Sequence, residues 1–161
     1  MDAKALKEIT SQLNLLYVED DENLRQETAK LFGHLFKSVS LAKNGKEGLR
    51  MFAQGSYDLI VTDINMPVMN GVDFCRNIRE NDSKTTIIIT SAHDESSYLL
   101  ELIDIGIDKF ILKPLDMQKL TSTLLTTCTN IVNAQLVLKY KQEIEATNLK
   151  LLQEHQQLKS S

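Results

Sequence analysis

The sequence predicts an α/β domain with a doubly wound, five-stranded parallel sheet, followed by a helical extension. Five short apolar segments alternate with segments of helical periodicity over about 115 residues. These apolar segments are continuous, which is typical of strands buried on both faces. Strict alternation of strands and helices favours a parallel sheet with right-handed crossovers. With 161 residues, of which 42% are hydrophobic and 25% charged, the chain has enough apolar material for one core.

The N-terminal half supplies the first two strand–helix pairs. Residues 1–14 form a polar lead-in whose Leu6, Ile9 and Leu13 have helical spacing and favour one or two helical turns. A strand is predicted at 15–18, and an apolar stripe then marks a helix: Leu24, Leu31, Phe32, Leu35 and Phe36. The next strand, at 38–42, has the weakest pattern. The helix after it is expected to start at a cap on Asn44 and to end at Gly55.

Three further strands are predicted at 59–62, 86–90 and 110–112. Pro67, Asn70 and Gly71 mark a loop after the third strand, and a helix through Phe74 and Ile78 follows. The helix after the fourth strand is expected to stop near Gly106, and the last helix to start near Asp116.

Composition excludes several classes of protein. The net charge of −4 argues against direct nucleic-acid binding by bulk electrostatics. No apolar run approaches the roughly 20 residues of a membrane span, and the N-terminus lacks the apolar region of a signal peptide, so a cytoplasmic location is expected. Cys75 and Cys128 are far apart and indicate two reduced thiols, and three scattered histidines do not suggest a zinc site.

Polar side chains follow four of the five predicted strands. Glu19 and Asp20 follow the first strand, Asp63 the third, Ser91 the fourth and Lys113 the fifth. In a parallel sheet these positions share one edge, which is where such folds bind ligands. Three carboxylates in one crevice favour a hard divalent cation, and Mg²⁺ fits a site of few carboxylates. An aspartate can act as a nucleophile toward phosphorus, with Lys113 and Ser91 neutralising phosphoryl oxygens.

In order and spacing, four segments resemble the receiver domains of two-component response regulators. The segments are YVEDDENLR at 17–25, DINMPVMNG at 63–71, TSA at 90–92 and FILKP at 110–114. The resemblance covers residues 15–130 and implies a flavodoxin-like sheet of order 2-1-3-4-5. It also implies a switch that accepts a phosphoryl group from a sensor histidine kinase or a phosphotransfer protein.

The resemblance also implies roles for individual residues. Asp63 resembles the phosphoacceptor, and Mg²⁺ would be held by Glu19, Asp20, Asp63 and the carbonyl of Asn65, with Asp20 more direct than Glu19. The remaining roles are as follows: Ser91 resembles the switch hydroxyl, Phe110 the aromatic switch, Lys113 the family lysine and Pro114 its frequently cis-bonded proline, while Asn65 and His93 occupy the positions that tune dephosphorylation.

Two features depart from the commonest family pattern or allow another assignment. Glu19 stands where the family often has Asp, which it tolerates. Thr90 precedes Ser91 and could be taken for the switch residue, but counting back from Lys113 favours Ser91.

Simpler interpretations accompany several of these assignments. Asp21 and Glu22 are better explained as the start of a helix than as metal ligands. His93 is equally well explained as a solvated loop residue, and Phe110 as ordinary core. Other functions are an aspartate phosphatase of the haloacid dehalogenase type, a flavin carrier, or an interaction module that is not phosphorylated. A phosphatase of this type needs a second acid two residues after its nucleophile, where this chain has Asn65. A flavin carrier would place Glu19 and Asp20 against the flavin phosphate, which they would repel.

Residues 131–161 predict a helical extension. Val137, Ile144, Leu151 and Leu158 recur every seven residues, while the second column is either Tyr140, Thr147 and Glu154 or Lys141, Asn148 and His155. We expect a weak parallel homodimer through this helix. The alternative is an amphipathic helix packed on its own domain. An output domain is expected beyond it in the full protein.

Overall fold

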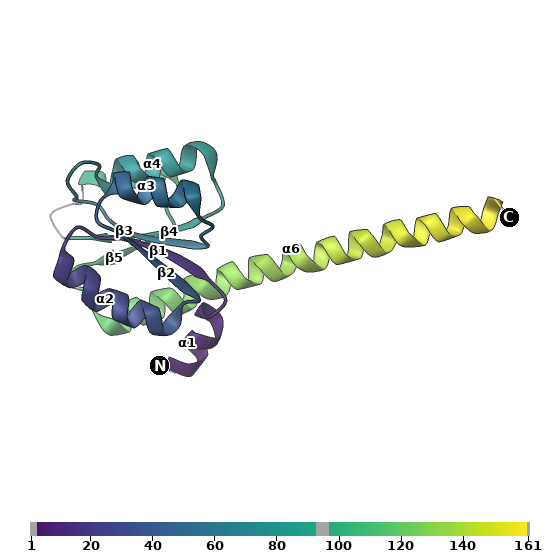
Figure 1. Cartoon of the computed structure of the whole chain (residues 1–161), viewed down its shortest axis with the longest axis horizontal. Coiled ribbons are helices and arrows are strands. Elements are labelled where there is room, and N and C mark those ends of the chain that lie inside the picture. The colour runs from purple at the N-terminus through teal and green to yellow at the C-terminus, as the bar shows by residue number, and fades with distance from the viewer. Residues whose placement is uncertain (1–2, 93–96, 161) are drawn as a thin grey trace. The chain divides into compact units, whose positions relative to one another are not determined.

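A five-stranded parallel sheet forms the centre of the protein in a computed structural model that describes residues 3–92 and 97–160. Its strands are β1 (Asn14–Val18), β2 (Ser38–Ala42), β3 (Leu59–Asp63), β4 (Thr86–Ser91) and β5 (Lys109–Leu112). The strand order is β2-β1-β3-β4-β5, and every neighbouring pair is parallel. The predicted fold class and strand order are therefore confirmed (Figure 1).

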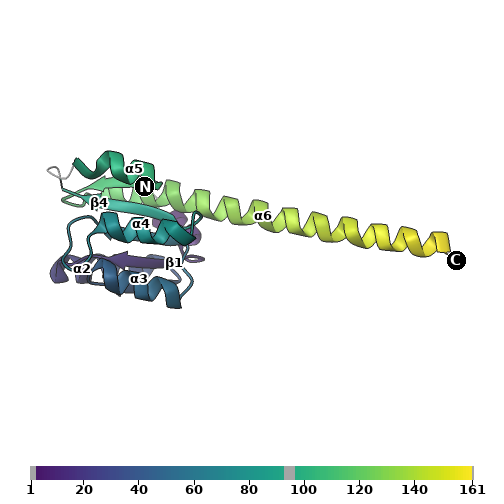
Figure 2. The ribbon, with the colours of Figure 1, turned by 90° about the horizontal axis from the view of Figure 1, so that it is seen from above.

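Helices cover both faces of the sheet. Their bounds are α1 (Ala3–Thr10), α2 (Glu22–Leu35), α3 (Gly45–Gln54), α4 (Gly71–Asn81), α5 (Leu99–Ile105) and α6 (Met117–Ser160). The helices α3, α4 and α5 lie side by side on one face, as Figure 2 shows, and α2 lies on the other with the first turns of α6 (Figure 1).

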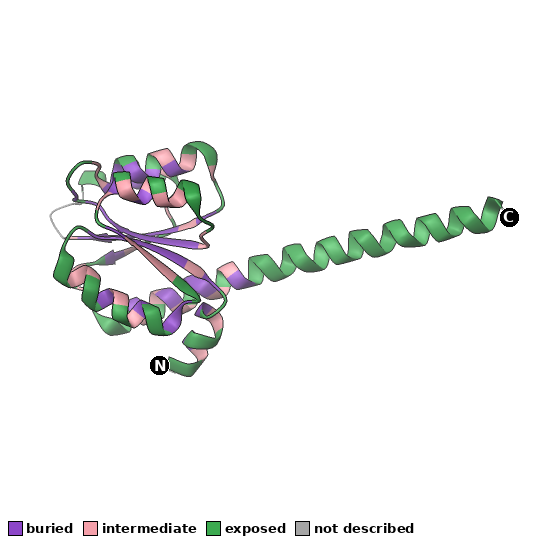
Figure 3. Cartoon of the chain, in the orientation of Figure 1, coloured by how far each residue is buried: buried purple, intermediate pink, exposed green. Residues whose placement is uncertain are grey.

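The strands are buried because their side chains are apolar on both faces. All five residues of β3 are buried, as are the last four of β1, and the strands form the buried centre in Figure 3. Strand β2 lies at the edge of the sheet and buries only its last residue, Ala42, which explains its weaker sequence pattern.

Side-chain caps fix the starts of three helices, two of which the sequence indicated. The backbone N–H groups of Leu24, Glu47 and Asp73 donate to the side chains of three capping residues, at 3.1, 2.8 and 2.9 Å. These capping residues are Asp21, Asn44 and Asn70. The interpretation of Asp21 as a helix start therefore agrees with the structure. Helix α5 ends at Gly106, which adopts a left-handed conformation with φ of 96°.

The lead-in helix α1 packs on the domain through its buried residues Leu6 and Thr10, and Leu13, which follows the helix, is also buried. The Thr10 hydroxyl lies 2.8 Å from the carbonyl of Leu35, at the last turn of α2, and 3.0 Å from that of Leu6. It therefore contributes a polar partner to a helix end whose carbonyls lack partners within the helix.

The chain divides into two compact units, Met1–Cys128 and Thr129–Ser161. Helix α6 runs without interruption from Met117 to Ser160. In the second unit, every residue from 133 to 160 is exposed (Figure 3). Within the described parts of the chain, we find no helix with the length and apolar character needed to cross a membrane.

Candidate functional site

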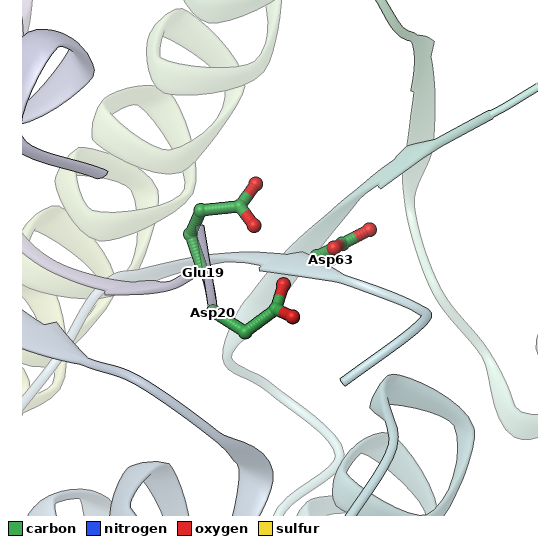
Figure 4. Close-up of side chains that lie close together, drawn as sticks. All are labelled: Glu19, Asp20 and Asp63. Atoms are coloured by element: carbon green, nitrogen blue, oxygen red, sulfur yellow. The ribbon is translucent and has the colours of Figure 1, made fainter. Parts of the chain in front are cut away.

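Three acidic side chains meet at the carboxyl-end edge of the sheet. Glu19 and Asp20 directly follow β1, and Asp63 is the last residue of β3, the strand next to β1. Figure 4 shows their carboxylates close together, and one oxygen of each lies within 4.8 Å of the others. This set of oxygen donors fits a hard divalent cation such as Mg²⁺.

Lys113 joins this cluster from the end of β5. Its Nζ atom lies 2.7 Å from Oε1 of Glu19 and 3.1 Å from Oδ2 of Asp63. Its backbone N–H donates to the carbonyl of Ser91 at 2.8 Å, which ties the end of β5 to the end of β4. The Lys113–Pro114 peptide bond is cis. The structure therefore brings together Glu19, Asp20, Asp63 and Lys113, as the sequence predicted.

Burial is the largest influence on the pKa values of the two carboxyl groups Glu19 and Asp63. It raises the pKa of Glu19 to about 7, although the hydrogen bond from Lys113 acts in the opposite direction. Burial also raises the pKa of Asp63, against the lowering effect of Lys113 and of the Ile64 N–H, which donates to Oδ1 at 2.8 Å. Burial lowers the pKa of Lys113, but its contacts with Glu19 and Asp63 outweigh this effect and raise it. One lysine does not balance three carboxylates, so a bound cation would be favoured.

The loop after Asp63 is held close to the strand end. The Gly71 N–H donates to the carbonyl of Ile64 at 2.7 Å, and a Cβ atom on Gly71 would lie 2.1 Å from the carbonyl oxygen of Asp63. The Gly45 N–H donates to the carbonyl of Met69 at 3.1 Å and anchors the loop to the start of α3. Asn65 is exposed in this loop, two residues after Asp63.

The residues predicted to act as switches lie on β4 and β5. Ser91 is buried at the end of β4, opposite Leu112, and its hydroxyl lies 3.2 Å from the carbonyl of Ala92. Phe110 is half-buried against the core, opposite Ile89. Their switching roles stay predictions. His93 lies outside the described residues.

Three features of the site were not predicted from the sequence. The Arg25 guanidinium, in α2, donates to the backbone carbonyl of Glu19 at 2.8 Å and so supports the β1–α2 loop. The ion pair between Glu19 and Lys113 was also missed, because residue order says only that two side chains share an edge. The Asn70-Gly71 pair predicted a turn, but it did not predict how closely the Gly71 backbone approaches the carbonyl oxygen of Asp63.

The sequence of this domain matches a family model described as "Response regulator receiver domain" over residues 15–125. The chain belongs to this family. The receiver domain is 37% identical over 106 residues to response regulator ArlR of Staphylococcus saprophyticus, covering 66% of this chain and 48% of ArlR. It is 31% identical over 107 residues to the uncharacterized transcriptional regulatory protein YkoG of Bacillus subtilis, covering 66% of this chain and 47% of YkoG. The chain thus matches over about half the length of these relatives.

Solved structures resemble the same receiver domain. The N-terminal domain of an uncharacterized protein from Wolinella succinogenes has a TM-score of 0.69 at 30% identity, covering 78% of this chain and 98% of that one. A response regulator receiver domain protein from Clostridium thermocellum has a TM-score of 0.67 at 25% identity, with the same coverage of both chains. The predicted family is therefore confirmed.

Proposed function

We propose that this receiver domain is a phosphorylation-dependent switch that accepts a phosphoryl group on Asp63 from a histidine kinase or a phosphotransfer protein. The observation that carries this proposal is the position of Lys113, whose ammonium group lies 3.1 Å from Asp63 Oδ2 beside the acidic cluster. A nucleophilic carboxylate with a fixed cation beside it is what transfer of an anionic phosphoryl group requires.

In the transfer, a carboxylate oxygen of Asp63 attacks phosphorus while the phosphorus–nitrogen bond of the donor phosphohistidine breaks. The bonding electron pair leaves with the imidazole, and Asp63 becomes an acyl phosphate. Lys113 would neutralise one phosphoryl oxygen. Mg²⁺ would be held by Asp20, Asp63 and the carbonyl of Asn65, with Glu19 completing the acidic site. When bound, it supplies further positive charge beside the phosphoryl oxygens.

Transmission would start at Ser91 and Phe110 and reach the surface of α5, β5 and the start of α6. These are the fourth helix, fifth strand and fifth helix of the domain when the lead-in helix is not counted. This surface exposes large apolar side chains: Leu99, Leu100, Ile103, Leu112 and Met117. The phosphoryl group would shift the population between two states of this surface. Asn65 and His93 would set the rate at which the acyl phosphate hydrolyses.

The C-terminal helix would join two copies of the chain. Its stripe of Val137, Ile144, Leu151 and Leu158 is exposed, and a second copy presents an identical stripe. Sedimentation velocity over a range of concentrations, with and without phosphorylation, tests whether this homodimer forms. A monomer at every concentration would contradict this part of the proposal.

The decisive experiment is phosphorylation by a small donor. The wild-type chain is incubated with acetyl phosphate and Mg²⁺, and its intact mass is recorded beside that of Asp63→Asn. Asp104→Asn, which changes an exposed aspartate of α5, is the matched control. We expect wild type and the control to gain one phosphoryl group and Asp63→Asn to gain none. Uptake by Asp63→Asn at the wild-type rate would contradict the assignment of the nucleophile.

A further inference from the structure

The second unit of the chain exposes an apolar stripe along one side of a helix. Val137, Ile144, Leu151 and Leu158 are 67%, 60%, 57% and 76% exposed. Residues three and four positions apart are neighbours on a helix surface, so the side chains on either side of this stripe decide what can cover it.

Two columns adjoin the stripe, and they differ in what lies around them. Asn148 has Ile144, Leu151 and Leu152 as helical neighbours at four, three and four positions. His155 has Leu151, Leu152 and Leu158 at four, three and three positions. Three of the four such neighbours of each polar side chain are therefore aliphatic, and the fourth is Glu145 for Asn148 and Lys159 for His155.

This arrangement favours one of the two heptad registers. With the stripe at position d, Lys141, Asn148 and His155 occupy position a, and the exposed Leu138 and Leu152 flank the seam at position e. With the stripe at position a, Glu154 enters the seam and Leu138 and Leu152 turn away from it. Although the second register centres Tyr140, the first register keeps both leucines beside the seam and Glu154 out of it. It also places a lysine in the seam, whose long stem can carry its charge out to water.

We propose that this helix pairs with a second copy of the chain as a parallel, in-register coiled coil in which Asn148 lies against Asn148 of the second copy. The inference rests on the homodimer in the proposed function and adds the alignment of its two parallel helices. Parallel pairing sets each polar residue beside its own copy, where two asparagine amides can hydrogen-bond. Antiparallel pairing sets position a opposite position d, so Asn148 would meet an aliphatic side chain and lose its partner.

Charge supports the same alignment. In this register Glu154 occupies position g and Lys159 position e of the next heptad. Parallel coiled coils place these two positions beside each other across the interface. Each helix would therefore give one attractive pair with the other, and a shift of one heptad would separate Glu154 from Lys159. Asparagine at position a is a known determinant of register in parallel dimers, and here Lys141 and His155 occupy the same column.

Cysteine cross-linking in the full chain tests the alignment. Asn148→Cys and His155→Cys place thiols in the seam, and Gln153→Cys places one at the outer position f as the matched control. The native Cys75 and Cys128 are buried, and the wild-type chain gives the background. Under mild oxidation, we expect both seam variants to form disulfide-linked dimers at least tenfold faster than the control. An antiparallel pair sets position a opposite position d and brings at most one of residues 148 and 155 near its own copy, so a link at one position alone overturns the proposal. Equal rates for all three variants also overturn it.

Asn148→Leu provides a second measurement. Removing the polar layer should tighten association at least tenfold in sedimentation equilibrium and should allow species larger than a dimer. Gln153→Leu, which adds a leucine on the outer face, should change the dissociation constant less than twofold. Similar effects of the two variants would contradict a seam at 148. Phosphoryl uptake from acetyl phosphate is recorded on the same samples, so that a failure of the coiled coil is distinguished from a failure of the receiver chemistry.

Discussion

Glu19 and Lys113 are 94 residues apart in the sequence, and their side chains form an ion pair with 2.7 Å between Oε1 and Nζ. The Glu19 side chain is fully buried and that of Lys113 is 21% exposed. The same ammonium group also reaches Asp63. Lys113 therefore contributes to the stability of the fold as well as to the proposed chemistry, because it is the counter-ion of a buried carboxylate.

Lys113→Met should destabilise the metal-free protein by about 2–4 kcal/mol at pH 8, because it leaves Glu19 buried without a counter-ion. The loss should be smaller at pH 5.5, where Glu19 takes up a proton. Urea unfolding followed by circular dichroism at both pH values measures this difference. Lys109→Met removes an exposed lysine from β5, the strand that precedes Lys113, and should change the free energy of unfolding by less than about 0.5 kcal/mol. Equal losses for the two variants would show that the ion pair does not contribute.

The stability of the metal-free protein should fall as the pH rises from 5.5 to 8. Burial raises the pKa of Glu19 from its ordinary value of 4.5 to about 7, so the folded protein binds this proton more tightly than the unfolded chain does. The resulting stabilisation is complete below pH 4.5 and is lost as the pH rises through 7. Asp63, whose pKa is also raised, acts in the same direction. We expect a decrease of about 1–3 kcal/mol in the free energy of unfolding.

Two comparisons identify the source of this pH dependence. Glu19→Gln should flatten the profile, and Mg²⁺ should raise the stability more at pH 8 than at pH 5.5, because protons and the cation compete for the carboxylates. A profile that Glu19→Gln leaves unchanged would assign the effect to other groups.

Gly71→Ala and Gly33→Ala should have opposite effects on stability. A Cβ atom at Gly71 would meet the carbonyl oxygen of Asp63 at 2.1 Å and Cα of Ile64 at 2.8 Å, so backbone must shift, at a cost of about 2–3 kcal/mol. Gly33 lies in α2 with nothing within 4 Å of the added atom, and alanine there should stabilise by about 0.5–1 kcal/mol. Thermal unfolding of both variants checks this. A Gly71→Ala protein as stable as wild type would contradict the observed packing of the loop.

Both cysteines should be unreactive in the folded protein. Burial raises the pKa of Cys75 and of Cys128 to about 12, so neither thiol ionises at pH 8, and both side chains are enclosed. Iodoacetamide at pH 8 should add no label to the native protein in an hour and two labels after unfolding in guanidinium chloride. Intact mass gives the count. Cys75 lies in α4 and Cys128 in α6. Labelling of the native protein at the rate of a free thiol would show that one of these two helices opens readily.

The sequence predicted the sheet well because its signals were local. Continuous apolar runs and the cap on Asn44 depend on neighbouring residues only. The acidic cluster was also predictable, because parallel strands bring their carboxyl ends to one edge. The ion pair between Glu19 and Lys113 and the contact of Arg25 with the Glu19 carbonyl were not. They depend on side-chain conformations and on the lateral distance between strands, which residue spacing does not encode.

The packing of α1 has a consequence for exchanging this domain between proteins. The family match begins at residue 15, but Leu6, Thr10 and Leu13 belong to the buried core, and Thr10 reaches the last turn of α2. A chimaera joined at residue 15 would expose the apolar surface beneath these side chains and leave the Leu35 carbonyl without its hydroxyl partner. A junction placed before residue 3 transfers α1 with the domain, so that the apolar surface stays covered.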